Sequence, residues 1–400
     1  MHPLKRRPSE IEAAFAQLDR EHLSRERRTV DGFVEPGSRV TTIVDGRQLV
    51  DFSSNDYLGL ARHPAVAAAM SECAERCGSG SGASHLVTGH GAEHSRLEEE
   101  LAVFTGRERA LLFSTGYMAN LAVMTTLVGR GETVLLDRLS HASLIDGGLL
   151  SGANFKRFAH ADARAAAAHA EKASVIATDG VFSMDGDIGP LDALARVSKS
   201  HDAWLVVDDA HGLGVVGATG RGAVEHFGLD AEAVPVLVGT LGKAFGSFGA
   251  FVAGSNELIE LLMQKARSYI YTTALPQPVA AASRKALEIA QRETWRRERV
   301  LALTARFRRG VEQVGVPVMG VPQPLTPIQP VLLGSSEAAL QAQRELLDAG
   351  FCVVAIRPPT VPRGSARLRV TLSAAHTEAQ VDSLVEALSR VCAARDIVSS

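Results

Sequence analysis

The sequence predicts an α/β protein built on a largely parallel β-sheet with helices on both faces, followed by a small α/β domain. Two observations lead to this fold class. Between residues 110 and 253, short apolar runs alternate with helical segments, which is typical of buried strands in a parallel sheet. After Pro276 and Pro278, a second and shorter set of strand and helix patterns extends to residue 394. The length of 400 residues allows two to three domains.

The N-terminal part is expected to form a helix and a hairpin before the sheet begins. An amphipathic helix is predicted over residues 4–28, with Ile11, Phe15 and Leu18 on one face. Residues 43–51 predict a β-hairpin with an Asp-Gly turn. Two further helices are predicted at residues 64–77 and 92–105.

The remaining elements follow in chain order. The six apolar runs expected as strands of the sheet occupy residues 110–113, 133–136, 174–178, 204–208, 235–238 and 250–253. Residues 279–315 are expected to be one long helix, and the proline-rich residues 316–329 an exposed turn or linker. The C-terminal domain is then predicted from strands at 328–333, 351–356 and 367–371 and helices at 336–349 and 377–394. These patterns divide the chain into a helix and hairpin segment (1–55), a large domain (56–280) and a small C-terminal domain (281–400).

Composition and charge exclude several classes of function. Lys and Arg number 42 and Asp and Glu 45, so the net charge of −3 gives no reason to expect a nucleic-acid partner or an anionic membrane. The most apolar stretch, residues 110–128, is interrupted by polar residues and is not expected to cross a membrane. No signal peptide is evident at the start. The four cysteines lack the spacing of a zinc site, so we expect reduced thiols, no metal and a cytoplasmic location.

Two acidic residues and a histidine follow the strand predicted at 204–208. In WLVVDDAHG (204–212), an apolar strand runs directly into Asp208, Asp209 and His211. Ligands of open α/β sheets bind outside the carboxyl ends of the strands, and a charge buried at such a position has to be paired. Taken alone, Asp208 is better explained as the cap of a turn.

A glycine-rich segment after the next strand, GTLGKAFG (239–246), contains Lys243. With glycines close by and no acidic neighbour in sequence, its amine is sterically open, and a desolvated amine of this kind is a nucleophile toward aldehydes. The alternatives are a solvated surface lysine or a phosphate ligand. The segment is not a P-loop, because Ala244 stands where Ser or Thr is needed and Leu237 where the first glycine belongs.

Two further segments complete the candidate site. STGYMAN (114–120) joins a strand to a helix that begins near Tyr117, where free N–H groups and the helix dipole suit a phosphate. DRLSHAS (137–143) places His141 just past a strand end, in position to stack on a flat ring. All four segments converge on one edge of the inferred sheet. Together they supply what pyridoxal 5′-phosphate needs: an amine for its aldehyde, a carboxylate for its pyridine nitrogen, a phosphate cradle and a stacking group.

Six motifs resemble the α-oxoamine synthase family, which belongs to the fold-type I enzymes that use pyridoxal 5′-phosphate. They are DFSSNDYLGL (51–60), SHAS (140–143), GVFSMDGD (180–187), VDDAHG (207–212), GTLGK (239–243) and AIRPPTVP (355–362). The resemblance extends from about residue 9 to residue 394. It implies the fold-type I transferase fold, in which the large domain holds a mostly parallel seven-stranded sheet. It also implies a homodimer with the site at the subunit interface.

The resemblance implies a role for each matching residue. Lys243 would form the Schiff base, Asp208 would pair with the pyridine nitrogen, and His141 would stack on the ring and lie near the substrate. The residues implied around the ring hydroxyl and the phosphate are His211, Ser183, Gly116, Tyr117, Thr240 and Thr273 of the partner subunit. Those implied at the substrates are Asn55 and Arg369 near the amino-acid carboxylate and Arg28 and Thr360 near the acyl group.

The activity implied is the condensation of an amino acid with an acyl thioester, with loss of CO2. The motif at 355–362 favours L-alanine and a pimeloyl thioester, carried by coenzyme A or by an acyl carrier protein. Other members, namely glycine C-acetyltransferase, 5-aminolevulinate synthase and serine palmitoyltransferase, remain alternatives. A dinucleotide-dependent oxidoreductase, to which GLGVVG (212–217) points, is disfavoured because other residues intervene after the strand. A non-catalytic subunit is disfavoured because it has no need for Lys243, Asp208 and His141.

Overall fold

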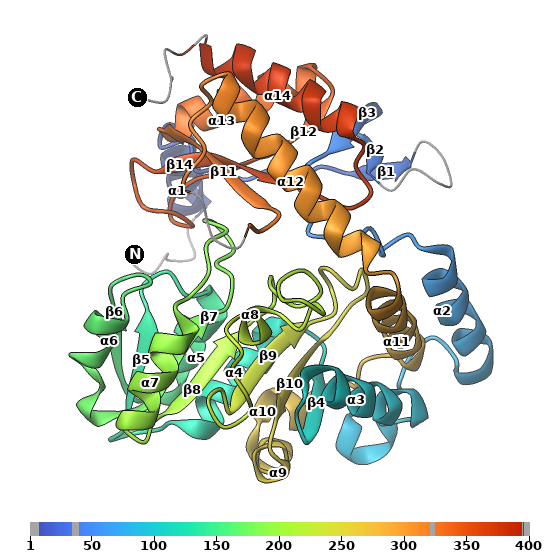
Figure 1. Cartoon of the computed structure of the whole chain (residues 1–400), viewed down its shortest axis with the longest axis vertical. Helices are drawn as coiled ribbons and strands as arrows, with labels where there is room; N and C mark the ends of the chain where they lie inside the picture. Colours follow the sequence, from blue (N-terminus) through green and yellow to red (C-terminus); the bar gives the residue numbers. More distant parts are fainter. Residues whose placement is uncertain (1–7, 34–39, 321–324, 394, 396–400) are drawn as a thin grey trace. The chain divides into compact units, whose positions relative to one another are not determined.

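The computed structural model describes residues 8–33, 40–320, 325–393 and 395 of the chain (Figure 1). These residues form two compact units. The large unit consists of Asn55–Ala302 and Val321–Pro327, and the small unit of Met1–Ser54, Leu303–Gly320 and Ile328–Ser400. The boundary near residue 302 falls inside one helix, α12 (Trp295–Gln313).

The large unit is built on a seven-stranded sheet with the strand order β4-β10-β9-β8-β7-β5-β6. The five strands from β9 to β6 pair in parallel, whereas β10 is antiparallel to both of its neighbours. The mostly parallel seven-stranded sheet expected from the family resemblance is therefore confirmed. The strands are β4 (Arg109–Phe113), β5 (Thr133–Asp137), β6 (Asn154–Phe158), β7 (Ala173–Asp179), β8 (Trp204–Asp208), β9 (Val236–Thr240) and β10 (Ala250–Gly254).

Helices connect these strands and cover the sheet. Two of them, α2 (Pro64–Cys77) and α3 (Ala92–Thr105), have the bounds that the sequence predicts. The others are η1 (His85–Gly89), α4 (Gly116–Leu127), α5 (Ala142–Ser151), α6 (Ala163–Ala167), η2 (Ala170–Lys172), α7 (Leu191–Ser200), α8 (Ala223–His226), α9 (Asn256–Lys265), α10 (Arg267–Ile270), α11 (Gln277–Arg292) and the first residues of α12.

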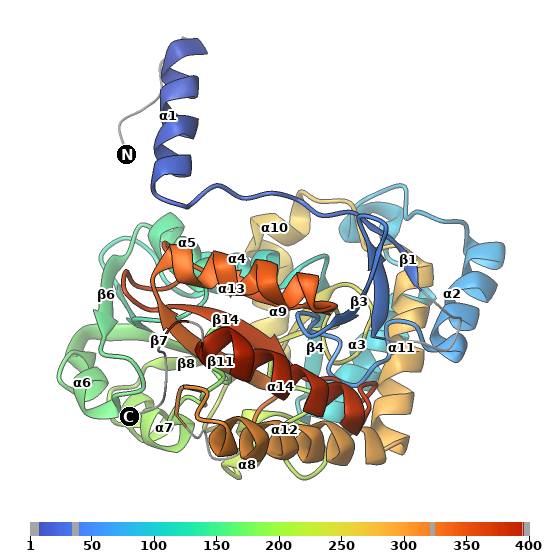
Figure 2. The same cartoon turned by 90° about the horizontal axis from the view of Figure 1, so that it is seen from above.

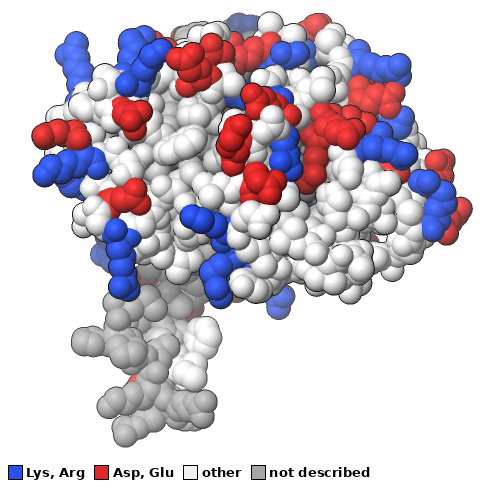
Figure 3. All heavy atoms as spheres, turned by 90° about the horizontal axis from the view of Figure 1, so that it is seen from below, with Lys and Arg blue, Asp and Glu red and all other residues white. Residues whose placement is uncertain are grey.

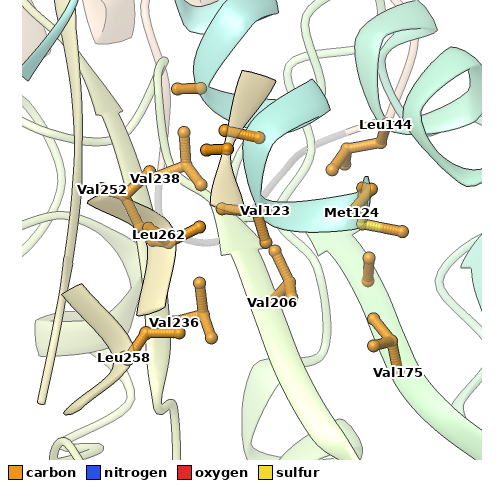
Figure 4. Packing of buried hydrophobic residues seen from close by; sticks show 14 of the residues in the cluster. Val123, Met124, Leu144, Val175, Val206, Val236, Val238, Val252, Leu258 and Leu262 are labelled. Carbon is orange, nitrogen blue, oxygen red and sulfur yellow. The ribbon is translucent and has the colours of Figure 1, made fainter. Parts of the chain in front are cut away.

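The sheet is buried on both faces, and alternate residues of each strand serve different cores. On one face Val206 and Val236 pack with Val123 and Met124 of α4 (Figure 4). On the other face Leu205, Val207 and Leu237 pack with helices α6, α7 and α8. This double burial explains why the strands read as continuous apolar runs rather than as alternating patterns.

A buried carboxyl group organises the loop that follows β8. Asp209 is completely buried and accepts a 2.7 Å hydrogen bond from the backbone N–H of Ala223, at the start of α8. Three glycines from different segments surround it. A Cβ on Gly180, Gly212 or Gly222 would lie between 1.8 and 2.3 Å from a carboxyl oxygen of Asp209. The loop therefore requires glycine at these positions because the carboxyl group fills the space.

The described residues of the small unit form two small sheets and four helical segments. One sheet has the order β1-β2-β3-β12 and the other β11-β14-β13. Helix α13 packs against the second sheet and against α14 (Figure 2). The elements are α1 (Pro8–Arg20), β1 (Val30–Phe33), β2 (Thr41–Val44), β3 (Arg47–Asp51), β11 (Ile328–Gly334), α13 (Ser336–Asp348), β12 (Phe351–Cys352), β13 (Val354–Ile356), β14 (Ala366–Thr371) and α14 (Glu378–Ala393), together with the end of α12.

Residues near both ends of the chain are joined within the small unit. The ring of Phe52 stacks on His376, with ring centroids 4.0 Å apart. The backbone N–H of Thr371 donates to the carbonyl of Phe52 at 2.7 Å, and His376 Nε2 contacts the carbonyl of Asp51 at 3.0 Å. The division predicted from the sequence, into 1–55, 56–280 and 281–400, stays a prediction. The two units instead group residues 1–54 with the C-terminal residues and leave 281–302 with the large sheet.

The six predicted strands of the large sheet are confirmed, as is the Asp-Gly hairpin of β2 and β3. Two strands were not predicted. β6 is an edge strand with mostly exposed side chains, and β1 is short and also largely exposed, so neither carries an apolar run. The single strand predicted at 351–356 is wrong, because the chain changes sheet at Val353: β12 pairs with β3, and β13 with β14.

Two helix predictions also need correction. The helix expected over 4–28 ends at Arg20, because His22 adopts a positive φ of 54° and the N–H of Leu23 bonds to the carbonyl of Leu18, which is a helix-terminating pattern. Residues 4–7 lie outside the described residues. The single helix expected over 279–315 is two helices, α11 and α12, because Glu293 leaves the helical conformation with ψ of 65°. The last residue of the helix predicted at 377–394 and part of the proline-rich stretch, residues 321–324, also lie outside the described residues.

Among the described residues, none of the helices combines the length and the apolar character that a bilayer crossing requires. On the face shown in Figure 3, acidic and basic side chains of the described residues are intermixed rather than gathered by sign.

The packing around Asp209 predicts a large loss of stability when Gly222 is replaced by alanine. Gly222 has a φ of +88°, and the added methyl carbon would lie 1.8 Å from Asp209 Oδ2. The matched control is Gly228→Ala, because Gly228 has a φ of +64° and open space around its missing Cβ. We expect the control to lower the free energy of unfolding by roughly 1–2 kcal/mol, and Gly222→Ala to cost about 1–3 kcal/mol more. Urea unfolding followed by circular dichroism measures both, and equal losses would contradict the packing argument.

Candidate active site

The segments that carry the predicted cofactor residues meet at one edge of the seven-stranded sheet. β5, β7, β8 and β9 run parallel, and β4 points the same way because β10 is antiparallel to both β4 and β9. Their carboxyl ends therefore share one edge, and the residues that follow them include Gly116, His141, Ser183, Asp208 and Lys243. The expected convergence is confirmed, while the role of each residue remains a prediction.

Asp208 is the last residue of β8, and it is only 6% exposed. Its Oδ2 accepts a 2.6 Å hydrogen bond from Nδ2 of Asn120 in α4. Its Oδ1 accepts a 3.0 Å bond from the backbone N–H of Ala210. These bonds offset part of the cost of burying a carboxylate. Because a carboxylate has about four acceptor sites, Asp208 retains capacity for one more donor, such as a protonated ring nitrogen.

Two further buried aspartates flank Asp208. Asp179 ends the neighbouring strand β7 and lies directly beside Asp208 in the parallel register. Burial raises the pKa of both Asp179 and Asp209 well above the usual range, and the negative charge of nearby Asp208 contributes in the same direction. The carboxyl groups of Asp179 and Asp209 are therefore favoured in the neutral form, which leaves Asp208 as the acceptor for a cationic ligand group.

Lys243 lies three residues after the end of β9, in a tight loop. The loop is closed by hydrogen bonds from the N–H of Gly246 to the carbonyl of Lys243 and from the hydroxyl of Thr240 to the carbonyl of Gly249, at 2.8 and 3.1 Å. The half-buried Lys243 ammonium interacts electrostatically with His141, Asp179 and Asp209. Its amine is therefore within reach of the aspartates at the ends of β7 and β8.

Helix α4 begins at this edge with an open N-terminus. Thr115 caps the helix by accepting the N–H of Met118 at 3.2 Å. A Cβ on Gly116 would meet no heavy atom within 4 Å, so the space in front of the first turn is open. The hydroxyl of Tyr117 donates to Asp146 in α5. Backbone N–H groups of a first helical turn have no partner within the helix, and together with the helix dipole they favour a phosphate.

His141 caps helix α5, and the surrounding protein covers its side chain only in part. Its Nδ1 contacts the hydroxyl of Ser143 at 2.7 Å, and its backbone N–H donates to Oδ2 of Asp179 at 3.0 Å. Burial of the ring in the surrounding protein lowers the pKa of His141, Asp208 acts in the opposite direction, and Lys243 lowers it further. The lowered pKa favours the uncharged ring at neutral pH.

Ser183 lies in the loop after β7, and His160 holds this loop. His160 contacts Oδ1 of Asp137 at 3.0 Å and Oδ2 of Asp187 at 2.8 Å, and its ring packs edge-on against Phe182. Burial works against a charged imidazole, but the hydrogen bonds to the two aspartates outweigh it and raise the pKa of His160 to about 10. The loop that carries Ser183 is therefore tied to the end of β5 by a charged histidine.

His211 is buried and contacts a tyrosine from the start of the large unit. The hydroxyl of Tyr57 lies 2.7 Å from His211 Nδ1 and donates to Oδ1 of Asn55 at 3.2 Å. Tyr57 is completely buried, so its position is fixed by packing as well as by these contacts. The structure thus joins the predicted residues Asn55 and His211 through Tyr57.

The remaining predicted residues are described by their own surroundings. Thr273 is exposed in the loop between α10 and α11. Arg28, Thr360 and Arg369 belong to the small unit: Arg28 and Thr360 are exposed, whereas Arg369 is buried in β14 opposite Pro330 and Val354. The predicted roles of these four residues remain untested predictions.

The residues of this edge fit pyridoxal 5′-phosphate. The open space in front of Gly116 suits a phosphate, and the buried carboxylate of Asp208 has spare acceptor capacity. The side chain of His141 is exposed, and the amine of Lys243 interacts electrostatically with Asp179 and Asp209. Each chemical group of the cofactor therefore has a partner of suitable charge or shape.

Sequence analysis did not assign a role to several residues that shape this site. Asn120 is a buried amide in an otherwise apolar helix, and Asp179 ends an apolar strand in the same way as Asp208. Both patterns are visible in the sequence and indicate polar residues near the site. The contacts of Ser143 with Asn120, Tyr57 with His211 and His160 with Asp187 join residues 23 or more positions apart, and no local pattern indicates them.

A cluster of three histidines lies elsewhere in the large unit. The side chains of His85, His90 and His94 bring ring nitrogens within 4.8 Å of one another. His94 accepts the N–H of Gly91 at Nδ1 and contacts the carbonyl of Leu275 through Nε2, so both of its nitrogens are engaged. His90 is engaged at both nitrogens as well, by Nδ1 of His85 and by the hydroxyl of Ser95, each at 3.0 Å. Hydrogen bonds within the large unit therefore account for most ring nitrogens of this cluster.

Comparison with known proteins assigns the chain and its fold to a family. The family model for class I and II aminotransferases matches residues 47–388, and the chain belongs to this family. Its fold is that of the fold-type I enzymes. Among its curated relatives, 8-amino-7-oxononanoate synthase from Stutzerimonas stutzeri (strain A1501) is 59% identical over 383 residues, which cover 95% of this chain and 96% of the relative. The enzyme of the same name from Methylococcus capsulatus is 58% identical, over 94% of this chain and 97% of the relative.

Solved structures are similar over nearly the whole chain. A serine palmitoyltransferase from S. paucimobilis with a bound PLP–myriocin aldimine has a TM-score of 0.91 and 30% identity, over 97% of this chain and 98% of that chain. An 8-amino-7-oxononanoate synthase from Francisella tularensis has a TM-score of 0.77 and 32% identity, over 87% of this chain and 99% of that chain.

The two contacts of His160 predict a pH-dependent stability. The folded-state pKa of about 10 lies above the value of about 6.5 expected in the unfolded chain, so the stabilisation is complete below pH 6.5 and is lost as the pH rises through 10. We therefore expect His160→Gln to lower the free energy of unfolding by roughly 2 kcal/mol at pH 6 and by progressively less toward pH 10. Denaturant unfolding across this range measures the difference.

The matched control is His169→Gln, because His169 is exposed. The control should track the wild type at every pH. A His160→Gln deficit that stays constant from pH 6 to pH 10 would show that the charge of His160 does not stabilise the loop.

Proposed function

We propose that this protein catalyses the pyridoxal 5′-phosphate-dependent condensation of L-alanine with a pimeloyl thioester. The products would be 8-amino-7-oxononanoate, CO2 and the free thiol, which is a step of biotin biosynthesis. The observation that carries the proposal is that Asp208, buried and hydrogen-bonded by Asn120, and Lys243 lie at the ends of the adjacent strands β8 and β9. The chain is also 59% identical to a curated 8-amino-7-oxononanoate synthase.

The residues divide the chemistry between them. When bound, pyridoxal 5′-phosphate supplies an aldehyde for covalent attachment and a pyridine ring that takes up negative charge from the substrate α-carbon. Asp208 keeps the ring nitrogen protonated by offering it a buried carboxylate. Lys243 supplies the amine for attachment, and its Nζ then accepts the α-proton of the amino acid and later returns one.

Other residues bind and orient. The first turn of α4 at Gly116 and Tyr117, with Thr240, holds the phosphate. His141 lies over the ring in its uncharged form, and Ser183 and His211 lie near the ring hydroxyl. Residues proposed for the substrates are Asn55 and Arg369 for the amino-acid carboxylate and Arg28 and Thr360 for the acyl group. A bidentate arginine at the carboxylate would fix which bond of the α-carbon reacts.

The assembly and location are part of the same proposal. We expect a homodimer in which Thr273 of the partner subunit completes the phosphate site, and a cytoplasmic enzyme whose partners are its two small substrates rather than nucleic acid or membrane. Sedimentation of the holoenzyme tests the dimer.

The proposal predicts that Lys243→Ala lowers kcat by about 10³-fold or more, because both the attachment and the proton transfer need its amine. Asp208→Asn should lower kcat by about 10²–10³-fold without unfolding the protein. Thiol release from pimeloyl thioester measures both. Borohydride reduction followed by peptide mass spectrometry should find a pyridoxyl group on Lys243.

Lys265→Ala is the matched control, since Lys265 is exposed at the end of α9. Its activity should equal that of the wild type. Substantial activity in Lys243→Ala, or no adduct at Lys243 in cofactor-saturated protein, would refute the assignment.

The choice of substrates is tested separately by crossing amino acids with thioesters. We expect the highest kcat/KM for L-alanine with a pimeloyl thioester, compared with glycine or serine and with acetyl, succinyl or palmitoyl donors. Preference for glycine with an acetyl donor would favour glycine C-acetyltransferase activity instead. Parallel assays with coenzyme A and acyl-carrier-protein thioesters identify the carrier.

A further inference from the structure

An unbroken chain of side-chain contacts links Asp208 to His141. Nδ2 of Asn120 donates to Oδ2 of Asp208 at 2.6 Å and to Oγ of Ser143 at 2.8 Å. The hydroxyl of Ser143 in turn lies 2.7 Å from Nδ1 of His141. Asn120 and Ser143 are both almost completely buried, so water does not compete for these bonds.

The hydrogens that Asn120 and Ser143 can donate indicate the direction of each hydrogen bond in this series of contacts. The amide of Asn120 carries two hydrogens, and it spends one on Asp208 and the other on Ser143. The Ser143 oxygen accepts from Asn120, and its own proton is free to point at His141. If the Ser143 hydroxyl donates in this way, Nδ1 of His141 is the acceptor and the single proton of the neutral ring is on Nε2. The oxygen has a second lone pair, so the choice of direction rests on a further donor.

A second donor supports the same tautomer. The backbone N–H of Ser143 also points at Nδ1 of His141, at 3.3 Å. A proton on Nδ1 would face this N–H, which cannot turn away. An inverted Asn120 amide would also place its oxygen against the Oδ2 acceptor of Asp208. Both ends of the chain therefore favour one arrangement.

The carbonyl oxygen of Asn120 is consistent with this orientation. Oδ1 of Asn120 is buried and has no hydrogen-bond partner among the described residues. An unpaired buried acceptor is costly, so the amide is held in place by what its nitrogen binds rather than by its oxygen. The two bonds of Nδ2 are thus the reason for the position of Asn120.

We propose that Asn120 and Ser143 are positioning residues that hold the Asp208 carboxylate and fix His141 as the neutral tautomer with its proton on Nε2. The exposed ring of His141 then presents an N–H donor and never a lone pair at Nε2. One series of hydrogen bonds therefore positions both the Asp208 carboxylate, which would pair with the ring nitrogen, and the His141 imidazole, which would stack on the ring. This inference deepens the proposed function and relies on it for the roles of Asp208 and His141.

The tautomer can be measured without any assay of activity. Nitrogen-15 NMR of histidine-labelled protein distinguishes a protonated from an unprotonated ring nitrogen, and the His141→Gln spectrum identifies the signals of His141. In the wild type, at a pH where the ring is neutral, we expect an unprotonated Nδ1 and a protonated Nε2. The opposite assignment, or an equal mixture of tautomers, would overturn the inference even if the enzyme is fully active.

Two substitutions test the series of hydrogen bonds that links Asp208 to His141. Ser143→Ala removes the hydroxyl but leaves the backbone donor, so we expect a mixture of tautomers at His141. Asn120→Ala should move the tautomer in the same direction and lower kcat by about 100-fold, because Asp208 loses its side-chain support. Unchanged tautomer and activity in both variants would refute the positioning role.

Ser268→Ala is the matched control. Ser268 donates to the carbonyl of Met118, which lies in the same helix as Asn120. Ser268 does not take part in the hydrogen bonds between Asp208 and His141. The control should leave the tautomer and kcat as in the wild type. Circular dichroism at the assay temperature confirms that each variant is folded, and if Asn120→Ala unfolds, Ser143→Ala alone decides the tautomer question. If wild-type protein shows the expected tautomer of His141 but does not catalyse the proposed condensation, the proposed function is wrong and this inference stands.

Discussion

The buried carboxyl group of Asp208, at the end of a central strand, is the constraint around which the candidate site is arranged. A carboxylate at the end of a central strand is tolerated only with hydrogen-bond donors, and the chain supplies them from α4 and from its own backbone. The neighbouring carboxyl groups of Asp179 and Asp209 are favoured in the neutral form. Of these three carboxyl groups, that of Asp208 is therefore the one available to a cationic ring nitrogen.

The parallel sheet converts sequence order into spatial proximity at this edge. Strands β4, β5, β7, β8 and β9 all end there, so loops that are far apart in sequence supply a helix N-terminus, a flat ring, a hydroxyl, a carboxylate and an amine to the same place. Apolar runs form these strands, because both faces of the sheet are buried. The chemistry is then a matter of the few polar residues just beyond each strand.

This division explains what could be predicted from the sequence. The apolar runs locate six of the seven strands, and the polar residues after them locate Lys243, Asp208 and His141. The edge strand β6 escapes prediction because its side chains are mostly exposed. The break between α11 and α12 escapes because Glu293 is not a residue that ends helices by itself. Contacts such as Asn120 with Asp208 or His160 with Asp187 join distant residues, and local patterns carry no information about them.

The three glycines around Asp209 have a consequence for how this chain accepts mutation. Gly180 follows β7, whereas Gly212 and Gly222 lie in the loop between β8 and α8, and the same carboxyl group leaves no room for a Cβ at any of them. Substitutions at these positions are therefore thermodynamically coupled to residue 209: in a background with a smaller side chain there, a methyl group at position 180 or 212 gains the room it lacks in the native chain. Such pairs would appear in a mutational scan as epistasis between residues that are neither adjacent in sequence nor part of the proposed chemistry.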